Sequence, residues 1–553
     1  MPSVASSTLA LSLCTKRIRP RERRSPDRWL SLLPFLILFL FALAFAQAAN
    51  AQQNSQLAAA IQKVMDRPEF AHANFGIEFF DYASNTVLYS HDAQKLFVPA
   101  STTKILTEGA LLASLGPAYR FHTKIYATGP VDKKGRLKGD LILVASGDPN
   151  LSNRIQPDST LAFVDEDHSY GGPALPGDPL TVIKSLAKQV YDKGVRRIDG
   201  RVLIDTSLFP DGPREGGTDV VMSSIMVNDN VLDIVAKPGA KTGDPISVAV
   251  SPQTGYARFT VHASTTAAGT PLSFSDPEFI SNPDGSVTIV LSGSLPLGID
   301  PQTVSIGVPS PTLFAQWVLR DSLTADGIQL KSPVALLQPD FPSLAHFYTA
   351  QNQVAEHVSL PLAEEIKVTL KVSQNLHAGM GPYLLGALAG KDTTNPLKKG
   401  FQLEHDFLQA ANLDLSGASQ GDGAGGDWAD LFSPDFMCHY LAYWTTRPDY
   451  DVFFHALPIL GKDGTLAKIQ VQNPGAGHVF AKTGTFGSAD RLNARGMLNG
   501  KGLAGYVITK SGRKIAFAAY VNHVAIPADP EAAQNVGGQA LGEIAAAAYD
   551  AGL

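Results

Sequence analysis

The order of hydrophobic and polar positions divides the chain into strand-rich and helical parts. Residues 76–81 and 86–89 are rich in aromatic and β-branched residues and flank a polar turn, a pattern typical of a β-hairpin. Residues 97–116 then carry apolar side chains among good helix formers. We therefore expect a hairpin followed by a helix that begins near Ser101 and ends at Gly116.

The long middle of the chain, residues 117–350, has a different pattern. It consists mostly of short β-type runs separated by turn residues, namely LILVAS, RVLIDT, ISVAVS, ARFTVHAS, SVTIVLSG and TVSIGV. We expect one helix among these runs, over residues 181–194. Helical patterns return over residues 351–470, and the C-terminal part predicts a hairpin over residues 502–523 followed by a last helix.

Strands near both ends, with helices between them, favour one α/β (α+β) domain whose antiparallel sheet joins N-terminal and C-terminal strands and is flanked by helices. A long mainly-β insertion, forming one or two extra domains, interrupts it. The expected boundaries are residues 52–116 for the first part, 117–350 for the insertion and 351–553 for the second part. A chain of 553 residues is long enough for more than one domain.

The N-terminal residues 1–51 have the features of a secretory signal. Residues 16–28 hold seven Lys or Arg, residues 30–46 are apolar except for one Ser, and Ala49 and Ala51 match a signal-peptidase site. A retained membrane anchor is the alternative, since about 17 apolar residues are at the lower limit for spanning a bilayer. We expect cleavage near Ala51 and a periplasmic protein without a stable membrane anchor.

The charge and cysteine content narrow the possible partners. Cleavage of the signal would remove seven basic and two acidic residues and take the formal charge from −6 to −11. Such an acidic protein has no electrostatic basis for binding nucleic acid. One cysteine, Cys438, would remain, so no intrachain disulfide is expected.

Three serines stand three residues before a lysine, which is the spacing that places both on one face of a helix. These pairs are Ser101/Lys104, Ser185/Lys188 and Ser511/Lys514. Ser511 falls in a predicted hairpin turn and Ser185 in the middle of a predicted helix. Only Ser101 is expected at a helix N-terminus, where the partial positive charge favours an alkoxide. Its lysine could act as a base once burial or a nearby cation lowers the lysine pKa.

Two further motifs accompany the Ser101 pair. Lys-Thr-Gly occurs at Lys241 and at Lys482, but the first copy lies between Pro-Gly and Asp-Pro and is predicted to be a loop. The second follows Val-Phe-Ala and can belong to a strand. Ser-x-Asn occurs once, as Ser373 and Asn375, at the junction of two helical segments.

The order and context of these motifs resemble the penicillin-recognising serine peptidases, and specifically the penicillin-binding protein 4-type D-alanyl-D-alanine carboxypeptidase/endopeptidase family (serine peptidase family S13). The resemblance covers nearly the whole chain after residue 51, including LILVASGDPNLS, MVNDNVLDIVAKPG and AKTGTFGSADRLNARG. It implies a β-lactamase/transpeptidase-like fold. The chain departs from the family pattern where Asp422-Gly423-Ala424-Gly425 replaces Asp-Gly-Ser-Gly.

The resemblance also implies roles for individual residues and requires no metal or cofactor. The implied catalytic residues are Ser101, Lys104, Ser373, Asn375 and Lys482, and the implied substrate-binding residues are Thr483, Gly484 and Thr485. In this scheme Ser101 is the nucleophile and Lys104 its base. Ser373 and Lys482 carry a proton to the leaving amine, and Asn375 holds the amide on the acyl side.

The implied partners are peptidoglycan stem peptides, with β-lactams as covalent inhibitors. The sequence leaves open whether the enzyme trims terminal D-Ala or cleaves D-Ala–meso-diaminopimelate cross-links. Two alternatives remain. A β-lactamase would share the motifs, although we find no Glu-x-x-Leu-Asn segment for deacylation. A non-catalytic cell-wall binding protein could retain the same fold.

Overall fold

The structure is a computed structural model that describes residues 54–529 and 531–551. The predicted secretory signal, residues 1–51, lies outside these residues. Within the described ranges, no helix has both the length and the hydropathy needed to cross a membrane.

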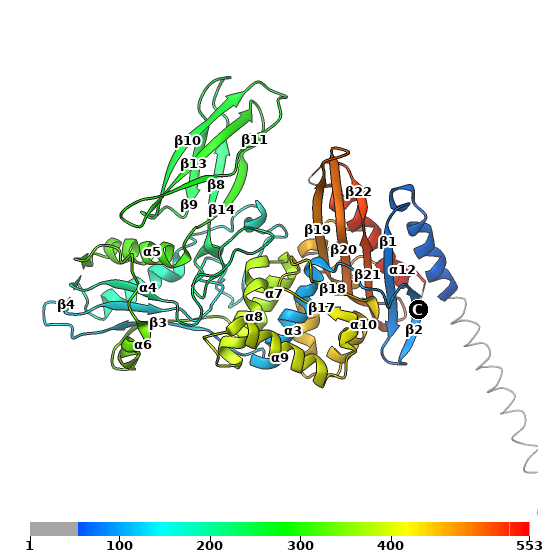
Figure 1. Cartoon of the computed structure of the whole chain (residues 1–553), viewed down its shortest axis with the longest axis horizontal. Coiled ribbons are helices and arrows are strands. Elements are labelled where there is room, and N and C mark those ends of the chain that lie inside the picture. Colours follow the sequence, from blue (N-terminus) through cyan, green and yellow to red (C-terminus); the bar gives the residue numbers. More distant parts are fainter. Residues whose placement is uncertain (1–53, 530, 552–553) are drawn as a thin grey trace, which may run out of the picture. The chain divides into compact units, whose positions relative to one another are not determined.

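One sheet joins strands from the two ends of the described chain (Figure 1). Its strands are β1 (Asn74–Asp81), β2 (Thr86–His91), β19 (Val479–Asp490), β20 (Arg495–Ile508), β21 (Lys514–Asn522) and β22 (Val524–Ile526). The order is β19-β20-β21-β1-β2, with β22 also paired to β20, and all these neighbours are antiparallel. The predicted fold class, an antiparallel sheet formed from both chain ends, is therefore confirmed.

Helices and two short strands accompany this sheet. They are a helix over residues 54–65, α3 (Lys104–Leu115), α7 (Leu362–Val372), α8 (Asn375–Leu384), α9 (Pro396–Ala410), β17 (Ala418–Ser419), β18 (Leu431–Phe432), α10 (Pro434–Trp444), α11 (Tyr450–Ala456) and α12 (Gln539–Asp550).

Side chains of β21 alternate between the two faces of the sheet, as a strand requires. Ile515 and Phe517 pack with Ile544 of α12, whereas Ala516 and Tyr520 pack on the face that α10 covers.

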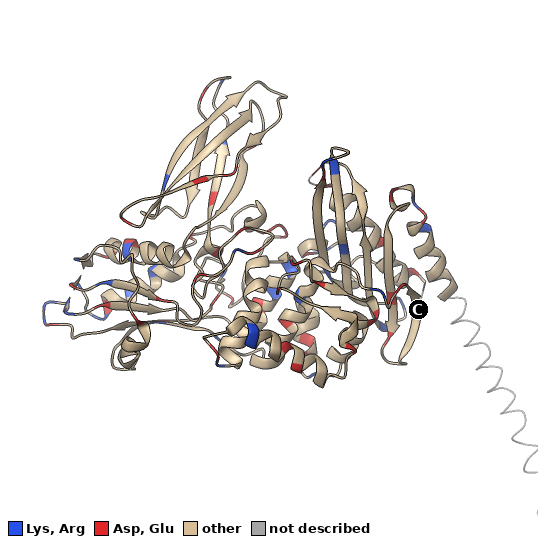
Figure 2. Cartoon of the chain, in the orientation of Figure 1, with Lys and Arg blue, Asp and Glu red and all other residues tan. Residues whose placement is uncertain are grey.

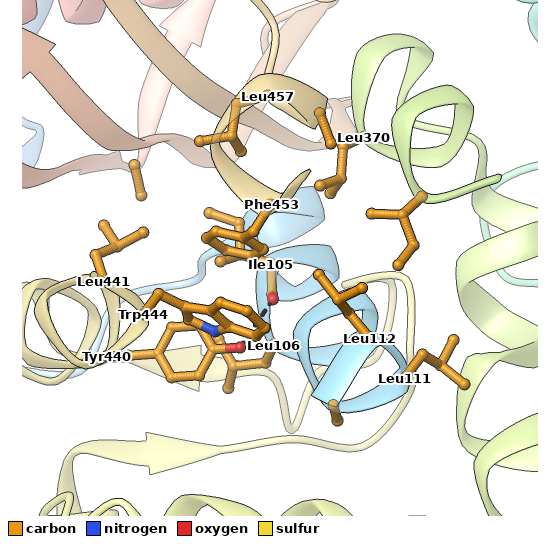
Figure 3. Close-up of a cluster of buried hydrophobic side chains, with 14 of the residues drawn as sticks. Ile105, Leu106, Leu111, Leu112, Leu370, Tyr440, Leu441, Trp444, Phe453 and Leu457 are labelled. Carbon is orange, nitrogen blue, oxygen red and sulfur yellow. Dashed lines mark hydrogen bonds between the residues drawn. The ribbon is translucent and has the colours of Figure 1, made fainter. Parts of the chain in front are cut away.

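The helix α3 is fixed by a large hydrophobic core (Figure 3). Ile105 and Leu112 are fully buried, and Trp444 of α10 stacks on Phe453 of α11 with ring centroids 4.3 Å apart. The Tyr440 hydroxyl donates a hydrogen bond to the carbonyl of Ile105 at 3.1 Å. Burial of each such side chain contributes about 1.5–3 kcal/mol, so the first turn of α3 is held rigidly.

Residues between α3 and α7 form several small sheets and three helices. Their elements are β3 (His122–Ala127), β4 (Arg136–Leu137), β5 (Leu141–Val144), α4 (Thr181–Asp192), β6 (Arg197–Ile198), β7 (Val202–Asp205), β8 (Val231–Lys237), β9 (Ser247–Ser251), β10 (Ala257–Thr266), β11 (Ser273–Phe274), β12 (Glu278–Ser281), β13 (Val287–Pro296), β14 (Gln302–Gly307), α5 (Pro311–Ala325), β15 (Gln329–Leu330), α6 (Phe341–Leu344) and β16 (Gln353–Val358). The sheets have the orders β16-β3-β5-β7, β15-β6-β4, β14-β8-β9 and β10-β13-β11, with β12 beside β13. The β10–β13 sheet carries few charged residues (Figure 2).

The helix predicted over residues 181–194 is confirmed as α4, but the sequence reasoning missed α5 and the short α6. The Ser310 side chain accepts a hydrogen bond from the backbone N–H of Leu313, and Pro311 occupies the first helical turn, which are ordinary helix-start signals. Strand β16 begins after residue 350 yet pairs with β3. The expected domain boundaries themselves stay predictions.

Candidate active site

Ser101 lies in a strained turn at the start of α3. The residues Ala100–Thr103 form one 3₁₀ turn, and the α-helix itself begins at Lys104, three residues later than expected. Ala100 has a positive φ of 47°, a conformation that costs free energy for a residue with a Cβ. Gly425 packs on this turn so closely that a Cβ there would lie 2.0 Å from the Ala100 carbonyl oxygen. The segment containing Gly425 therefore holds the turn.

Lys104 lies directly beside Ser101. Its Nζ donates hydrogen bonds to Ser101 Oγ at 2.7 Å, to Asn375 Oδ1 at 2.6 Å and to the Ala424 carbonyl at 2.8 Å. The side chain is fully buried, and burial lowers the pKa of Lys104 to about 8, although nearby carboxylates, foremost Glu215, oppose the shift. About a tenth of Lys104 is thus neutral at pH 7, and about half near pH 8.

A second serine–lysine pair faces the first. Ser373 is the left-handed residue that ends α7, with φ 63°, and it accepts a hydrogen bond from Lys482 Nζ at 2.7 Å. Lys482 also donates to the Thr483 carbonyl at 2.9 Å. Burial, with the added charges of Lys104 and Lys501, holds the pKa of Lys482 well below its usual value. This amine is therefore a weaker base than an exposed lysine.

Asn375 opens α8, two residues after Ser373, and its side chain contacts Lys104. Its Oδ1 accepts the Lys104 hydrogen bond, while its Nδ2 lies against Gly217 from the strand-rich stretch. A Cβ at Gly217 would lie 2.1 Å from that nitrogen, so a side chain there would displace the Asn375 amide. The Glu215 carboxylate accepts from the backbone N–H of Gly217 at 2.8 Å and of Thr218 at 2.7 Å, which fixes the loop.

The three predicted substrate-binding residues follow Lys482 along β19. Thr483 is nearly buried, and its hydroxyl bonds that of Thr465 at 2.8 Å. Gly484 passes the nucleophile turn so closely that a Cβ would lie 2.2 Å from the Pro99 carbonyl oxygen. Thr485 is exposed and faces the same side as Ser101. The strand edge therefore runs along the turn that carries Ser101.

These groups border a cleft of about 620 Å³. Its lining combines residues from distant parts of the sequence, namely Ser101, Asp165, Glu166, Asp167, Tyr170, Gly217, Val372, Ser373, Asn375, Gly464, Thr465, Ala467, Lys468, Ile469, Thr483, Thr485, Glu531, Gln534, Asn535 and Gln539. The buried Lys104 and Lys482 amines reach the cleft through Ser101 and Ser373. A peptide-sized ligand fits such a volume.

The rejected copies of the motifs lie elsewhere, as their local sequence predicted. Lys241 is in an exposed turn before β9, and Ser185 lies inside α4. The second Lys-Thr-Gly copy, at Lys482, is on a strand. Cys438 is fully buried, as expected for a small apolar side chain.

Sequence reasoning missed the residues that hold the Ser373 turn. The Tyr170 hydroxyl donates to the Ser373 carbonyl at 2.6 Å. The Gln374 side-chain amide donates to Asp167 Oδ1 and to Ser169 Oγ, both at 3.1 Å. About two hundred residues separate these partners, and nothing in the local sequence marks the contact.

A buried ionic cluster lies behind this turn. Arg154 Nη2 bonds Asp167 at 2.6 Å and Asp229 at 2.8 Å, and Asp229 also bonds His168 and His377. The surrounding carboxylates, overcoming burial, raise the pKa of His377 to about 10. Asp167, His168 and Asp229 lie close enough together to ligate a metal, but the two carboxylates already have the Arg154 guanidinium and the His168 and His377 imidazolium groups as cationic partners.

One other group of side chains has the spacing of cation ligands. Glu78 of β1 lies near Asp435 and His439 of α10, with one ligand atom from each within 4.8 Å of the others. Glu78 is almost fully buried, and one of its carboxylate oxygens has no hydrogen-bond partner. Burial, with a smaller contribution from Asp435, raises the pKa of Glu78 to about 7, so a proton can balance this carboxylate.

Comparison with known proteins gives one consistent result. A sequence model of the D-Ala-D-Ala carboxypeptidase 3 (S13) family matches residues 57–543. The D-alanyl-D-alanine carboxypeptidase of Actinomadura sp. (strain R39) is 26% identical over 483 residues, 84% of this chain and 82% of that protein. The D-alanyl-D-alanine carboxypeptidase DacB of Haemophilus influenzae is 23% identical and covers 81% of this chain and 85% of its own length. The crystal structure of penicillin-binding protein 4 from Haemophilus influenzae has a TM-score of 0.67 at 20% identity, covering 89% of this chain and 98% of that chain.

Proposed function

Because the chain belongs to the D-Ala-D-Ala carboxypeptidase 3 (S13) family, we propose that it cleaves peptidoglycan stem peptides next to D-alanine through a serine acyl-enzyme. Its substrates are peptides that end in D-Ala-D-Ala, D-Ala–meso-diaminopimelate cross-links, or both. The observation that carries the proposal is the 2.7 Å hydrogen bond between Lys104 Nζ and Ser101 Oγ beside a peptide-sized cleft. A lysine with a lowered pKa next to a serine hydroxyl is the arrangement that nucleophilic catalysis requires.

In the first step, Ser101 Oγ forms a bond to the carbonyl carbon of the D-alanine that precedes the cleaved bond. Its proton passes to the neutral Lys104 amine. The carbonyl oxygen becomes an oxyanion, which we assign to the backbone N–H groups of Ser101 and Thr485. Each such donor is worth about 3–4 kcal/mol to the transition state. Asn375 positions the substrate amide on the acyl side.

In the second step, the carbon–nitrogen bond breaks and the leaving amine takes a proton from the Ser373 hydroxyl, which regains one from the Lys104 ammonium, so that Lys104 is neutral again before hydrolysis. Lys482 assists this proton transfer, since its Nζ donates a hydrogen bond to Ser373 Oγ at 2.7 Å. Thr483 and Thr485 bind the leaving part of the substrate along the strand edge. Water then hydrolyses the ester, with the amine of Lys104 taking one of its protons, and Ser101 is restored.

A β-lactam imitates the cleaved amide, so we propose that it acylates the same serine. Penicillin-binding protein 4 from Haemophilus influenzae, which shares the fold with a TM-score of 0.66, has been crystallised with a β-lactam. The signal-like pattern of residues 16–46 supports a periplasmic location for this activity.

The test is intact-mass spectrometry of the protein after incubation with benzylpenicillin, followed by mapping of the adduct. We expect one penicilloyl group on Ser101 and none in the Ser101→Ala variant. Ser185→Ala is a matched control, because Ser185 has the same Ser-x-x-Lys spacing inside α4 and should not affect labelling.

Each alternative result has a defined meaning. Labelling that persists in Ser101→Ala would contradict the assignment of the nucleophile. An unmodified protein with intact penicillin would favour a non-catalytic binding protein, and an unmodified protein with hydrolysed penicillin would indicate a β-lactamase. Digestion of purified muropeptides then separates carboxypeptidase from endopeptidase activity.

A further inference from the structure

Glu78 is a buried carboxylate that the proposed mechanism does not use. It lies on β1, where α10 packs against the sheet, and only 2% of its surface is exposed. Its Oε1 has no hydrogen-bond partner among the described residues, and none of their Lys or Arg side chains forms an ion pair with it. A buried carboxylate without such partners is unfavourable, so this position favours a positive partner.

Helix α10 places two further metal-binding side chains beside Glu78. Asp435 and His439 are four residues apart, so they lie on the same face of the helix. One ligand atom from each of the three side chains lies within 4.8 Å of the other two. Bonds from zinc to oxygen and nitrogen are about 2.0–2.2 Å long, so movements of about 1 Å would gather the three atoms around one ion.

The surroundings orient the imidazole and leave a path from solvent. The His439 ring packs on Phe80 of β1 with ring centroids 4.9 Å apart. Its Nδ1 lies 2.9 Å from the Asp435 carbonyl oxygen and 3.6 Å from Asp435 Oδ1, and a neutral imidazole has one nitrogen that can bind a metal. The Asp435 and His439 side chains are 25% and 45% exposed, so an ion can reach the buried carboxylate from solvent.

An ordinary structural role explains Asp435 but not Glu78. Asp435 stands in the first turn of α10, where a negative charge stabilises a helix. Glu78 is in the middle of a strand and gains nothing of this kind. The buried cluster around Arg154 differs, because there a guanidinium lies between the carboxylates. The pair of carboxylates beside His439 therefore has room for a cation that the Arg154 cluster does not need.

We infer that Glu78, Asp435 and His439 form a binding site for a divalent metal ion of the zinc type, with water completing the coordination. Zinc accepts carboxylate and imidazole ligands together, and three protein ligands plus water is an arrangement that it adopts. The ion would tie β1 to α10, whose Tyr440 hydroxyl bonds the first turn of α3. Other residues line the active-site cleft, so this site is separate from the proposed catalytic groups.

The test measures zinc binding to the purified protein without a polyhistidine tag. A chelator first removes any metal, and Zn²⁺ is then titrated in competition with a fluorescent zinc indicator of known affinity. We expect one high-affinity site in the wild type. Glu78→Gln, which keeps the shape of the buried side chain, and His439→Ala should each weaken binding by about a hundredfold or more, because loss of a partner even outside the ligand shell costs about 10–100-fold.

Helix α11 supplies a matched control. Asp451 and His455 repeat the Asp-x-x-x-His spacing on exposed positions of this helix. Within the described part of the chain, no third His, Cys, Asp or Glu lies close enough to complete a ligand group with them. His455→Ala should therefore leave zinc binding unchanged, which separates the buried site from weak binding by surface histidines.

X-ray absorption at the zinc edge identifies the ligands. We expect only oxygen and nitrogen ligands, at about 2.0–2.2 Å. Cys438 lies next to the site in the sequence, but its Sγ points to the Glu78 carbonyl oxygen, 3.5 Å away. A sulfur ligand at about 2.3 Å would show that Cys438 binds the metal and would overturn the assigned ligand set. The unfolding temperature should rise with added Zn²⁺ in the wild type and not in Glu78→Gln.

Two results would overturn the metal site. One is wild-type protein that binds Zn²⁺ no more tightly than Glu78→Gln, and the other is equal losses of affinity in His439→Ala and His455→Ala. If one of the two site variants fails to fold, as judged by thermal unfolding, the other decides. None of these results bears on the acylation of Ser101, so the proposed function is tested separately.

Discussion

The chemistry of the site depends on amines that burial has made less basic. Lys104 and Lys482 are both fully buried, and each donates to one serine hydroxyl at 2.7 Å. Burial lowers the pKa of Lys104 to about 8 while nearby carboxylates oppose the shift, whereas for Lys482 burial and two neighbouring amines lower the pKa together. The two lysines therefore differ in their electrostatic surroundings.

The pH dependence of acylation tests which lysine is the base for Ser101. If Lys104 is the base, the acylation rate constant should rise with pH and level off above about pH 8, because the neutral amine is the active form. Below that pH it should fall about tenfold per unit. The measurement is benzylpenicillin acylation between about pH 6 and pH 9.

Lys104→Arg complements this profile. A guanidinium stays protonated at these pH values, so acylation should fall by about a hundredfold or more. A profile without a limb near pH 8 would contradict Lys104 as the base for Ser101.

At the level of elements, the α7–α8 junction depends on the strand-rich insertion. Ser373 adopts a left-handed conformation that a residue with a Cβ adopts only when its surroundings impose it. The hydroxyl of Tyr170 holds its carbonyl, and Asp167 holds the neighbouring Gln374. Residues of this strand-rich stretch therefore hold the Ser373 turn, whose hydroxyl we propose to be catalytic, and also line the cleft.

Replacing Tyr170 by Phe tests this support. Loss of one neutral hydrogen bond of about 1 kcal/mol should lower the acylation rate constant by about fivefold. Tyr348→Phe is the matched control, because it removes the bond from a tyrosine hydroxyl to Asp205 in the same insertion but away from the cleft. Equal rate losses in both variants would show that the Tyr170 effect is general destabilisation.

At the level of the whole molecule, the buried cluster around Arg154 joins the insertion to α7 and α8. His377 of α8 bonds Asp229 at one nitrogen and Glu365 of α7 at the other, both at 2.8 Å. Arg154 links Asp229 to Asp167 and hence to the Ser373 turn. Several elements of the site thus share one network of charges.

Arg154→Met should destabilise the protein by about 3–5 kcal/mol, because it leaves the Asp167 and Asp229 carboxylates buried with one cation fewer. Denaturant unfolding monitored by tryptophan fluorescence measures the change. Arg258→Met is the matched control, since the Arg258–Asp284 pair is exposed and should contribute little. Equal effects of the two variants would contradict a structural role for the buried cluster.

The sequence by itself determined the fold class and five residues that come together at the cleft. Hydrophobic periodicity is local, so the hairpin of β1 and β2 and the strand β19 could be recognised without a structure. The Ser101–Lys104 spacing is also local, because one helical turn places both on the same face. Helix α5 was missed although Ser310 and Pro311 mark its start, because the surrounding β-type runs dominated the interpretation. The roles of the site residues stay proposals.

The tertiary structure alone decided which distant groups complete the site. Tyr170 and Ser373 lie about two hundred residues apart, and the Ala424 contact to Lys104 is made by a backbone carbonyl that every residue type carries. Lys501 appears in the sequence as one lysine in a strand, and its burial against Thr485 and Gln534 is visible only in the structure. Burial and long-range pairing arise from packing, so local sequence patterns do not encode them.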